Sequence, residues 1–308
     1  MILFLLLVSV SMLSVYLKLL ERACKEIPML VPHKAIDNVS RAIALTKISA
    51  IVPAFNEEDN ICDCVTSILN SSNLTAEFLE VWVVDDRSTD KTPIILQTLQ
   101  QSLNDPRLKL IPGLPPPEGQ VWVGKNWACD RATKYATGDF FLFIDADVRL
   151  KPGAIEAATE VARSEQIDLL NCIPATVCGS LTEWLVQPFM FINLLISLND
   201  KAVKNPQTET AFAAGPFILF GRSAYEKVGG HRAVANQVAE DVALARLIKH
   251  GGLKLGYRLG AEIATLRMYR SWAALWEGWT KVLYVGAQRN FFTMLSLATI
   301  MLIRLVGK

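Results

Sequence analysis

The sequence lacks an excess of either charge. Lysine and arginine total 31 and aspartate and glutamate total 30, so the formal net charge is +1. A nucleic-acid-binding surface needs a basic excess to meet the phosphate backbone, and this balance provides none. We therefore expect no nucleic-acid partner.

The sequence also lacks cysteine and histidine residues at the spacings typical of metal sites. The six cysteines are scattered, and Cys62 and Cys64 have no second pair at the spacing of a zinc site. We interpret the cysteines as small buried or half-buried hydrophobic residues, kept as thiols in a reducing cytoplasm. His231 and His250 have no second histidine or carboxylate at ligand spacing, and we expect both at the surface.

Charge is missing altogether from the first seventeen residues, in a chain that is 51% hydrophobic. Residues 1–20 therefore predict a transmembrane anchor. A cleaved signal peptide is the alternative, but the segment lacks a basic start and a small-residue cleavage site. Lys18 and further basic residues follow this segment and none precede it, so the positive-inside rule places the rest of the chain in the cytoplasm, at a plasma or internal membrane.

From residue 48 the pattern changes to short apolar runs that alternate with amphipathic stretches, which predicts βαβ units around a mostly parallel sheet. The proline-rich stretch 113–119 predicts a surface loop, because proline removes hydrogen-bond donors and fixes the backbone. The expected strands are 48–53, 80–84, 107–111, 140–144 and, near the middle of the chain, 168–173. The expected helices are 57–69, 92–103, 126–136 and 153–163.

The second half contains uncharged and tryptophan-rich stretches. Residues 184–198 carry no charge but are short for a bilayer span, so a core helix and a helix in the membrane interface both fit. Trp272, Trp276 and Trp279 recur near helical spacing, which fits an interfacial helix or, equally, a helix packed on the catalytic domain. Residues 291–303 resemble an incomplete membrane span. The expected parts are an anchor at 1–20, a catalytic domain at 46–270, and an interfacial helix with a membrane segment at 271–308.

Two of the expected strands end in pairs of acids. Asp85 and Asp86 follow the strand at 80–84, at the carboxyl edge where ligands of open α/β sheets bind. A charge that leaves a buried strand needs a partner, so we expect Asp85 to accept hydrogen bonds from a base or a ribose. For Asp90 and Thr92, helix capping is the simpler interpretation.

Asp145 and Asp147 follow the strand at 140–144, with Ala146 between them. Residues two apart in extended backbone point to the same side, so the two carboxylates can share one ligand. Paired carboxylates suit Mg²⁺ or Mn²⁺, which would neutralise the charge on a leaving diphosphate. An isolated Asp-x-Asp is also compatible with a turn or a helix cap, but two acid clusters in one βαβ array are a stronger signal.

Two further helix starts carry charged residues. Lys125 precedes the helix at 126–136 and is a candidate phosphate contact, with a solvated lysine as the alternative. Glu240 and Asp241 begin another helix, where complementarity to the helix dipole alone explains acids. A carboxylate placed there and close to a sugar would also serve as a general base for an acceptor hydroxyl.

Taken in order, these motifs resemble those of family 2 glycosyltransferases with the GT-A fold. The motifs are 51–58, 84–90, 145–147 and 240–241, and the resemblance spans about residues 48–270. It implies an α/β, Rossmann-like fold with a mixed, mostly parallel sheet flanked by helices. It also implies an inverting transfer of a sugar from a nucleotide-sugar donor, with a UDP-sugar favoured.

The resemblance assigns roles residue by residue. Asp145 and Asp147 would bind the metal and the donor diphosphate, and Asp241, with Glu240 beside it, would be the catalytic base. The residues implied to bind the nucleotide sugar are Pro53, Ala54, Asn56, Glu57, Asp85, Asp86, Lys125, Asp145, Ala146 and Asp147.

The carboxyl-terminal part is similar to membrane enzymes that glycosylate carotenoids or other polyprenoid lipids. This implies a lipid acceptor, with Arg267, Arg270 and Trp272 on the acceptor and membrane side. Processive polysaccharide synthases carry a Gln-x-x-Arg-Trp motif, but here Arg267 replaces the glutamine and Ser271 separates Arg270 from Trp272.

Two other functions are alternatives to a glycosyltransferase. A phosphatase of the haloacid-dehalogenase type also carries an Asp-x-Asp, but after the first strand of its fold. A non-catalytic nucleotide-sugar-binding membrane protein would keep the same motifs.

Overall fold

The computed structural model describes residues 27–32, 46–197 and 210–286, together with positions 18, 21, 203 and 208. The chain divides into two compact units, which are described separately. The sheet unit comprises Met29–Val177 and Lys201–Leu266, and the helix-pair unit comprises Met1–Pro28, Cys178–Asp200 and Arg267–Lys308. The predicted anchor at 1–20, apart from position 18, and the predicted segment at 291–303 lie outside the described residues.

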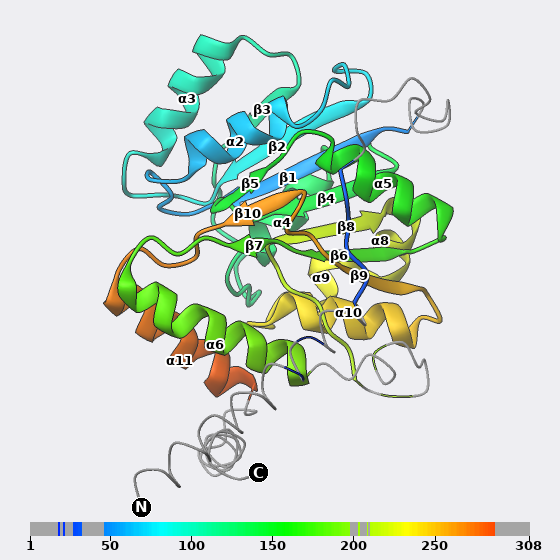
Figure 1. Ribbon diagram of the computed structural model, residues 1–308. Helices are drawn as coiled ribbons and strands as arrows, with labels where there is room; N and C mark the ends of the chain where they lie inside the picture. Colours follow the sequence, from blue (N-terminus) through cyan, green and yellow to red (C-terminus); the bar gives the residue numbers. More distant parts are fainter. Residues whose placement is uncertain are drawn as a thin grey trace, which may run out of the picture. The chain divides into compact units, whose positions relative to one another are not determined.

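The sheet unit is built on a seven-stranded sheet with the order β3-β2-β1-β4-β8-β6-β9 (Figure 1). β8 is antiparallel to both of its neighbours, and the other paired strands are parallel. The mostly parallel mixed α/β sheet expected from the sequence is therefore confirmed. Its strands are β1 (Ile48–Ala54), β2 (Leu79–Asp85), β3 (Leu108–Ile111), β4 (Phe140–Ile144), β6 (Leu169–Ile173), β8 (Phe217–Gly221) and β9 (Leu255–Leu259).

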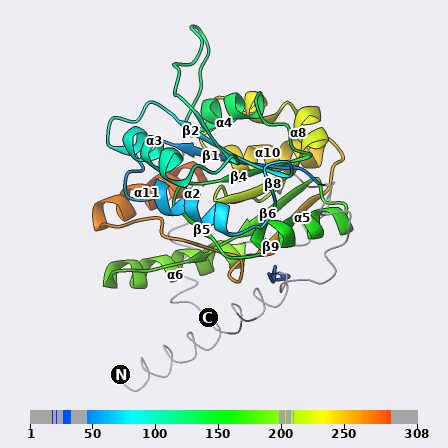
Figure 2. The same ribbon diagram turned by 90° about the horizontal axis from the view of Figure 1, so that it is seen from above.

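Side chains of successive strand residues alternate between two hydrophobic cores, one on each face of this sheet. In β4, Leu142 and Ile144 belong to one core, whereas Phe141 and Phe143 belong to the other. Figure 2 shows the helices of the sheet unit in two layers, one on either side of the main sheet. The first core is covered by α2 (Ile61–Asn70), α3 (Thr92–Leu103) and α5 (Ala154–Ser164), and the second by α4 (Asn126–Thr133), α8 (Arg222–Val228) and α10 (Glu240–His250).

A smaller, three-stranded sheet has the order β5-β10-β7, and its first strand, β5, comes directly after β4 in the chain. β5 (Val148–Leu150) is antiparallel to β10 (Ala264–Leu266), and β10 is parallel to β7 (Ala175–Thr176). The short turn between β4 and β5, residues 145–147, is therefore held between two sheets.

Sequence periodicity located most elements of the first half. Two predicted elements, the strand at 140–144 and the helix at 92–103, match β4 and α3 residue for residue. α2 begins four residues later than predicted, because residues 57–60 form a turn in which the amides of Asn60 and Ile61 donate to the carbonyl of Glu57. The strands β5, β7, β8, β9 and β10 were not predicted.

His231 is buried, so its expected place at the surface is wrong. It lies in α9 (Gly230–Ala233), with 3% of its surface exposed. The Tyr225 hydroxyl lies 2.9 Å from Nδ1 of His231, and the His231 amide donates to the same hydroxyl at 3.0 Å. Burial, together with the nearby charge of Lys125, lowers the pKa of His231 to about 3, so the ring is neutral at pH 7. His250 is exposed, as expected.

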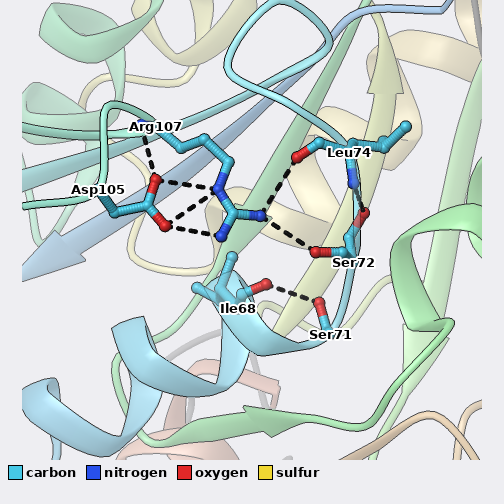
Figure 3. A network of polar contacts seen from close by, with 6 residues as sticks. All are labelled: Ile68, Ser71, Ser72, Leu74, Asp105 and Arg107. Carbon is cyan, nitrogen blue, oxygen red and sulfur yellow. Dashed lines mark hydrogen bonds and ion pairs between the residues drawn. The ribbon is translucent and has the colours of Figure 1, made fainter. Parts of the chain in front are cut away.

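Arg107 joins two connecting segments at the amino-terminal edge of the main sheet (Figure 3). Its Nη1 donates to the carbonyls of Ser72 at 3.0 Å and Leu74 at 3.3 Å, and its Nη2 lies 2.7 Å from Oδ2 of Asp105. A hollow of about 630 Å³ is lined by these residues and their neighbours. Because its donors are used within the protein, we interpret Arg107 as a structural link between the α2–β2 and α3–β3 connections.

The described part of the helix-pair unit contains α6 (Leu181–Ser197) and α11 (Trp272–Gly286), which lie side by side (Figure 1). Arg267 donates to Glu183 through two nitrogens, at 2.9 and 3.1 Å, and Glu183 is 1% exposed. Trp279 Nε1 donates to Oε1 of Gln187 on α6 at 3.2 Å. Within the described residues, no helix combines the length and the apolar character needed to cross a bilayer.

Candidate active site

The loops that follow β1 and β2 are tied together by reciprocal hydrogen bonds. The Asn56 amide donates to the Ser88 hydroxyl at 2.9 Å, and the Thr89 amide donates to the Asn56 side chain at 2.8 Å. The Glu57 amide donates to the Thr92 hydroxyl at 2.8 Å. Asn56 adopts a φ of 55°, a left-handed conformation that asparagine tolerates better than most residues. The two loops therefore form one preorganised edge.

The loop after β3 reaches the same edge at Gly113. A Cβ atom at this position would lie 2.3 Å from the carbonyl oxygen of Asp85 and 2.4 Å from the amide nitrogen of Arg87, so only glycine fits. Asp85 also accepts a hydrogen bond from the Ser88 amide at 3.2 Å, and Asp86 pairs with Arg87 at 3.2 Å. These contacts place the predicted nucleoside-binding residues at the carboxyl edge of the sheet, where β1 and β2 end.

Asp145 and Asp147 directly follow β4, as predicted, but they lie in a turn to β5 and not in extended backbone, since the Val148 amide donates to the carbonyl of Asp145 at 3.1 Å. The Asp145 amide donates to the carbonyl of Pro216 at 3.3 Å. Oδ1 of Asp147 is buried and, among the described residues, has no hydrogen-bond partner. Burial raises the pKa of Asp147 to about 7, and the Asp145 and Glu57 carboxylates add to the rise. Ala146, between the two acids, is buried in the core.

Lys125 links this turn to α10. Its Nζ forms a close ion pair with Oδ1 of Asp145 and lies 3.3 Å from Oε1 of Glu240. Burial disfavours the charged form of Lys125, but the two carboxylates outweigh this effect and hold its pKa well above the usual range. The lysine is therefore a charged bridge between two predicted site acids, and not the solvated side chain that the sequence also allowed.

Asn126 fixes the start of α4 against the segment that precedes α10. Its side chain is fully buried, and its Nδ2 lies 3.0 Å from the carbonyl of Val234, 3.2 Å from that of Ala235 and 3.0 Å from that of Gln237. Lys125 directly precedes Asn126, and Glu240 follows the segment that Asn126 contacts. The contacts of Asn126 therefore hold Lys125 and Glu240 close to each other.

Three charged side chains converge on Gly215, just before β8. A Cβ atom there would lie 3.0 Å from Nζ of Lys125, 3.4 Å from Oδ2 of Asp145 and 3.7 Å from Oδ2 of Asp241. Oδ1 of Asp241 accepts a hydrogen bond from the Val242 amide at 2.8 Å, which leaves Oδ2 on the side of Gly215. The missing side chain of Gly215 therefore leaves room at the centre of the charged cluster.

Asp241 is also electrostatically suited to proton transfer. Burial raises its pKa to about 7, and the adjacent Glu240 carboxylate adds to the rise. A carboxyl group with such a pKa exchanges a proton readily near neutral pH, which is the property required of a general base.

The structure thus gathers most of the predicted site residues in the sheet unit. The remaining three, Arg267, Arg270 and Trp272, belong to the helix-pair unit. Gly215 and Asn126 were not predicted, because a glycine and a buried asparagine form no recognisable catalytic pattern. The gathered residues are Pro53, Ala54, Asn56, Glu57, Asp85, Asp86, Lys125, Asp145, Ala146, Asp147, Glu240 and Asp241.

A divalent cation fits the turn at Asp145 and Asp147. Across the described stretches, no three His, Cys, Asp or Glu side chains are grouped as ligands of a metal ion. Mg²⁺ in phosphate-transferring sites is commonly held by only one or two carboxylates, with the remaining positions filled by phosphate oxygens and water. The buried, unpartnered Oδ1 of Asp147 is the kind of oxygen that such an ion would satisfy.

Comparison with known proteins gives a family match. The model of glycosyl transferase family 2 matches residues 49–229, which include the acids at 85–86 and 145–147 and also Lys125 and Gly215. The match ends before Glu240 and Asp241.

Curated relatives carry the name 4,4'-diaponeurosporenoate glycosyltransferase. The protein from Staphylococcus haemolyticus (strain JCSC1435) is 28% identical over 243 residues, which are 78% of this chain and 62% of the relative. The protein from Staphylococcus aureus (strain MRSA252) is 26% identical over the same length, covering 78% of this chain and 61% of the relative. The chain therefore spans about three fifths of the length of these relatives.

Solved structures show the same fold. The mannosyltransferase PcManGT from Pyrobaculum calidifontis, in complex with GDP-Man and Mn²⁺, superposes with a TM-score of 0.58 at 17% identity, over 92% of this chain and 75% of that chain. Glucosyl-3-phosphoglycerate synthase from Mycobacterium tuberculosis, in complex with Mn²⁺, UDP-glucose and phosphoglyceric acid, has a TM-score of 0.51 at 21% identity, over 81% of this chain and 82% of that chain. At these identities the likeness concerns the fold alone.

Proposed function

The chain belongs to glycosyl transferase family 2, and from that premise we propose that it transfers a sugar from a nucleotide-sugar donor to a hydroxyl group of a membrane lipid. The observation that carries this proposal is the convergence of Lys125, Asp145 and Asp241 around Gly215. A transferase needs a place for the donor diphosphate beside a place for the acceptor oxygen, and this cluster supplies candidates for both. Because the chain belongs to this family, it is not a phosphatase of the haloacid-dehalogenase type.

On the donor side, the edge formed by Asn56, Asp85 and Gly113 is suited to hold the nucleoside, with Pro53 and Ala54 at the end of β1 beneath it. The two solved structures of similar fold contain GDP-Man and UDP-glucose, each with Mn²⁺. We favour a UDP-sugar as donor. Asp145 and Asp147 would hold Mg²⁺ or Mn²⁺, which when bound supplies positive charge to the departing nucleoside diphosphate.

On the acceptor side, Asp241 is the proposed base and acts through Oδ2. It removes the proton of the acceptor hydroxyl while the acceptor oxygen bonds to the anomeric carbon and the bond to the diphosphate oxygen breaks. A single displacement of this kind inverts the anomeric configuration. Glu240 keeps Lys125 in place beside Asp145, and the lysine is suited to contact the donor phosphates.

The proposed acceptor is a carotenoid or another polyprenoid lipid. The support is the name of the curated relatives, which are 4,4'-diaponeurosporenoate glycosyltransferases. A lipid acceptor requires access to a membrane, and we propose that Arg267, Arg270 and Trp272 lie on the membrane side. The predicted anchor at 1–20 and a cytoplasmic catalytic domain complete this proposal.

The helix-pair unit has apolar side chains suited to a membrane surface. On α6, Leu181, Trp184 and Leu185 are 75%, 65% and 68% exposed, and on α11, Trp272 and Trp276 are 54% and 64% exposed. Tryptophan favours the headgroup region of a bilayer, because it combines an apolar ring with a polar N–H group. These residues support a membrane-associated role for both helices.

The test is a donor screen in membrane extracts that contain the chain. Radiolabelled UDP- and GDP-sugars are supplied with Mn²⁺, and the label is followed into the organic-solvent extract and into high-mass material. Label in extractable lipid supports the proposal, provided that an Asp145→Asn, Asp147→Asn double variant loses it. Label in high-mass polymer would favour a processive synthase. No transfer from any donor would contradict the proposed activity and favour a non-catalytic binding protein.

A further inference from the structure

Arg149 lies in β5, two residues after Asp147. Its Nη1 donates to the carbonyls of Ala146 at 3.1 Å and Val148 at 3.0 Å. Its Nη2 lies 3.5 Å from Oδ2 of Asp63 on α2. One guanidinium nitrogen therefore holds the carbonyl groups of the two residues that flank Asp147.

The strand that carries Arg149 is itself fixed. Within the smaller sheet, Arg149 pairs in register with Thr265 of β10. The side chain is 24% exposed, so most of it is enclosed by the protein. A guanidinium group anchored in this way restricts the backbone of the 145–148 turn more than a freely rotating side chain would.

The donors of Arg149 go to the backbone and to Asp63, and none goes to Asp147. Oδ1 of Asp147 is left buried and unpartnered in the described part of the chain, whereas the neighbouring Asp145 is paired with Lys125. The positive charge of Arg149 nevertheless lies close enough to act on this acidic region, since it opposes the rise in the pKa of Glu57 that burial causes. Arg149 thus holds the backbone of the turn through the carbonyls of Ala146 and Val148 without bonding to Oδ1 of Asp147.

We propose that Arg149 is a positioning residue, which holds the 145–148 turn so that the Asp147 carboxylate is oriented to bind a divalent cation that accompanies the donor diphosphate. The inference rests on the proposed function, because it concerns the cation at the donor site. Residues that orient metal ligands through hydrogen bonds commonly change metal affinity when they are replaced. A purely structural role would instead affect the stability of the fold and leave cation binding unchanged.

Arg107 provides a matched control in the same unit. Its Nη1 also donates to two carbonyl groups, those of Ser72 and Leu74, and it also pairs with an aspartate, Asp105. Arg107 (Figure 3) lies beside the start of β3, at the amino-terminal edge of the sheet, whereas Asp147 follows the carboxyl end of β4. Replacing Arg107 removes two similar carbonyl contacts, and a closer ion pair, at the opposite edge of the sheet.

The experiment measures Mn²⁺ binding by the full chain, with and without UDP, from the electron paramagnetic resonance signal of free Mn²⁺. We expect Arg149→Gln and Arg149→Lys each to weaken Mn²⁺ binding by about tenfold or more, as replacement of groups that orient metal ligands typically does. Lysine keeps the charge but cannot span both carbonyls and Asp63. We expect Arg107→Gln to lower the melting temperature without changing the Mn²⁺ dissociation constant.

Several outcomes would overturn the inference. Wild-type Mn²⁺ affinity in Arg149→Gln, with a lowered melting temperature, would reduce Arg149 to a structural link like Arg107. Wild-type affinity in Arg149→Lys would mean that charge alone matters. Absence of Mn²⁺ binding by the unmodified chain would also overturn it, and the lipid-transfer assay on the same preparation would show separately whether the proposed function stands.

Discussion

Lys125 forms an ion pair with Glu240, with 3.3 Å between Nζ and Oε1. Asp241, the next residue in the chain, instead accepts the Val242 amide through Oδ1 and places Oδ2 toward Gly215. The two adjacent acids therefore differ in their surroundings: Glu240 holds the lysine, and Asp241 keeps one oxygen available for a proton. This difference separates the candidate base from its neighbour more clearly than their positions in the sequence.

Replacement of Asp241 tests this assignment. We expect Asp241→Asn to lower kcat by about 100-fold or more, which is the usual contribution of a general base, while the dissociation constant of the donor stays unchanged. Transfer rates and calorimetric donor binding are the measurements. Glu240→Gln is the control and should retain more activity, because it loses a contact to Lys125 but keeps the base. If Glu240→Gln lowers kcat more than Asp241→Asn does, the base is Glu240.

The rate should depend on pH through Asp241. A base acts in its deprotonated form, and burial has raised the pKa of this carboxyl to about 7. We therefore expect kcat/KM to rise about tenfold per pH unit below pH 7 and to level off above it. In Glu240→Gln the loss of the neighbouring negative charge should lower the pKa of Asp241, so the rise of kcat/KM with pH should occur at lower pH. If kcat/KM rises over the same pH range in this variant, the titrating group is not Asp241.

A side chain at Gly215 should disturb the charged cluster more than the fold. In Gly215→Ala the new Cβ atom would lie 3.0 Å from Nζ of Lys125 and within 3.7 Å of the Asp145 and Asp241 carboxylates. We expect a loss in kcat/KM of about tenfold to about 100-fold, because small displacements of reacting groups are costly, with little change in melting temperature. Gly221→Ala is the matched control, since its Cβ would meet only the carbonyl of Asp168, at 3.6 Å. Equal activity of the two variants would contradict this interpretation.

Asn126 should matter for stability. Asn126→Ala removes the donor to three backbone carbonyls in a fully buried position. The carbonyls of Val234 and Ala235 keep the amides of Gln237 and Val123 as donors, so the loss is that of the side-chain hydrogen bonds, about 1 kcal/mol in the free energy of unfolding, which a urea titration would measure. Asn70→Ala, an exposed position at the end of α2, is the control and should change stability little. A wild-type stability for Asn126→Ala would show that other contacts keep α4 in register.

Membrane association should depend on the exposed tryptophans of α11. We expect Trp272→Ser combined with Trp276→Ser to weaken binding to phospholipid vesicles by about 30-fold, because each partly immersed ring contributes roughly 1 kcal/mol. Vesicle sedimentation is the measurement. Ile94→Ser is the control, because Ile94 is 65% exposed but lies on α3 of the sheet unit. Unchanged binding of the double variant would mean that the two rings do not contribute.

Local sequence patterns were sufficient to predict the first half of the sheet. Strands such as β4 are continuous apolar runs that end in acids, and helices such as α3 have the expected periodicity, so their limits depend on residues close in the chain. β8 was not predicted, and its antiparallel direction depends on pairing with β4 and β6, which lie far from it in the chain. His231 was misplaced for a related reason, since its burial depends on Tyr225 and Phe143 in other elements.

The sequence by itself determined the α/β class, the mostly parallel sheet and the acidic residues at strand ends, because these features follow from periodicity and from residue type at known spacing. Only the tertiary structure decided which acids share a partner. The Lys125 bridge spans residues from two distant parts of the chain, and Gly215 acquires its importance from side chains that surround it in space. Electrostatic energy and van der Waals contact depend on distances between atoms, which the order of residues does not specify.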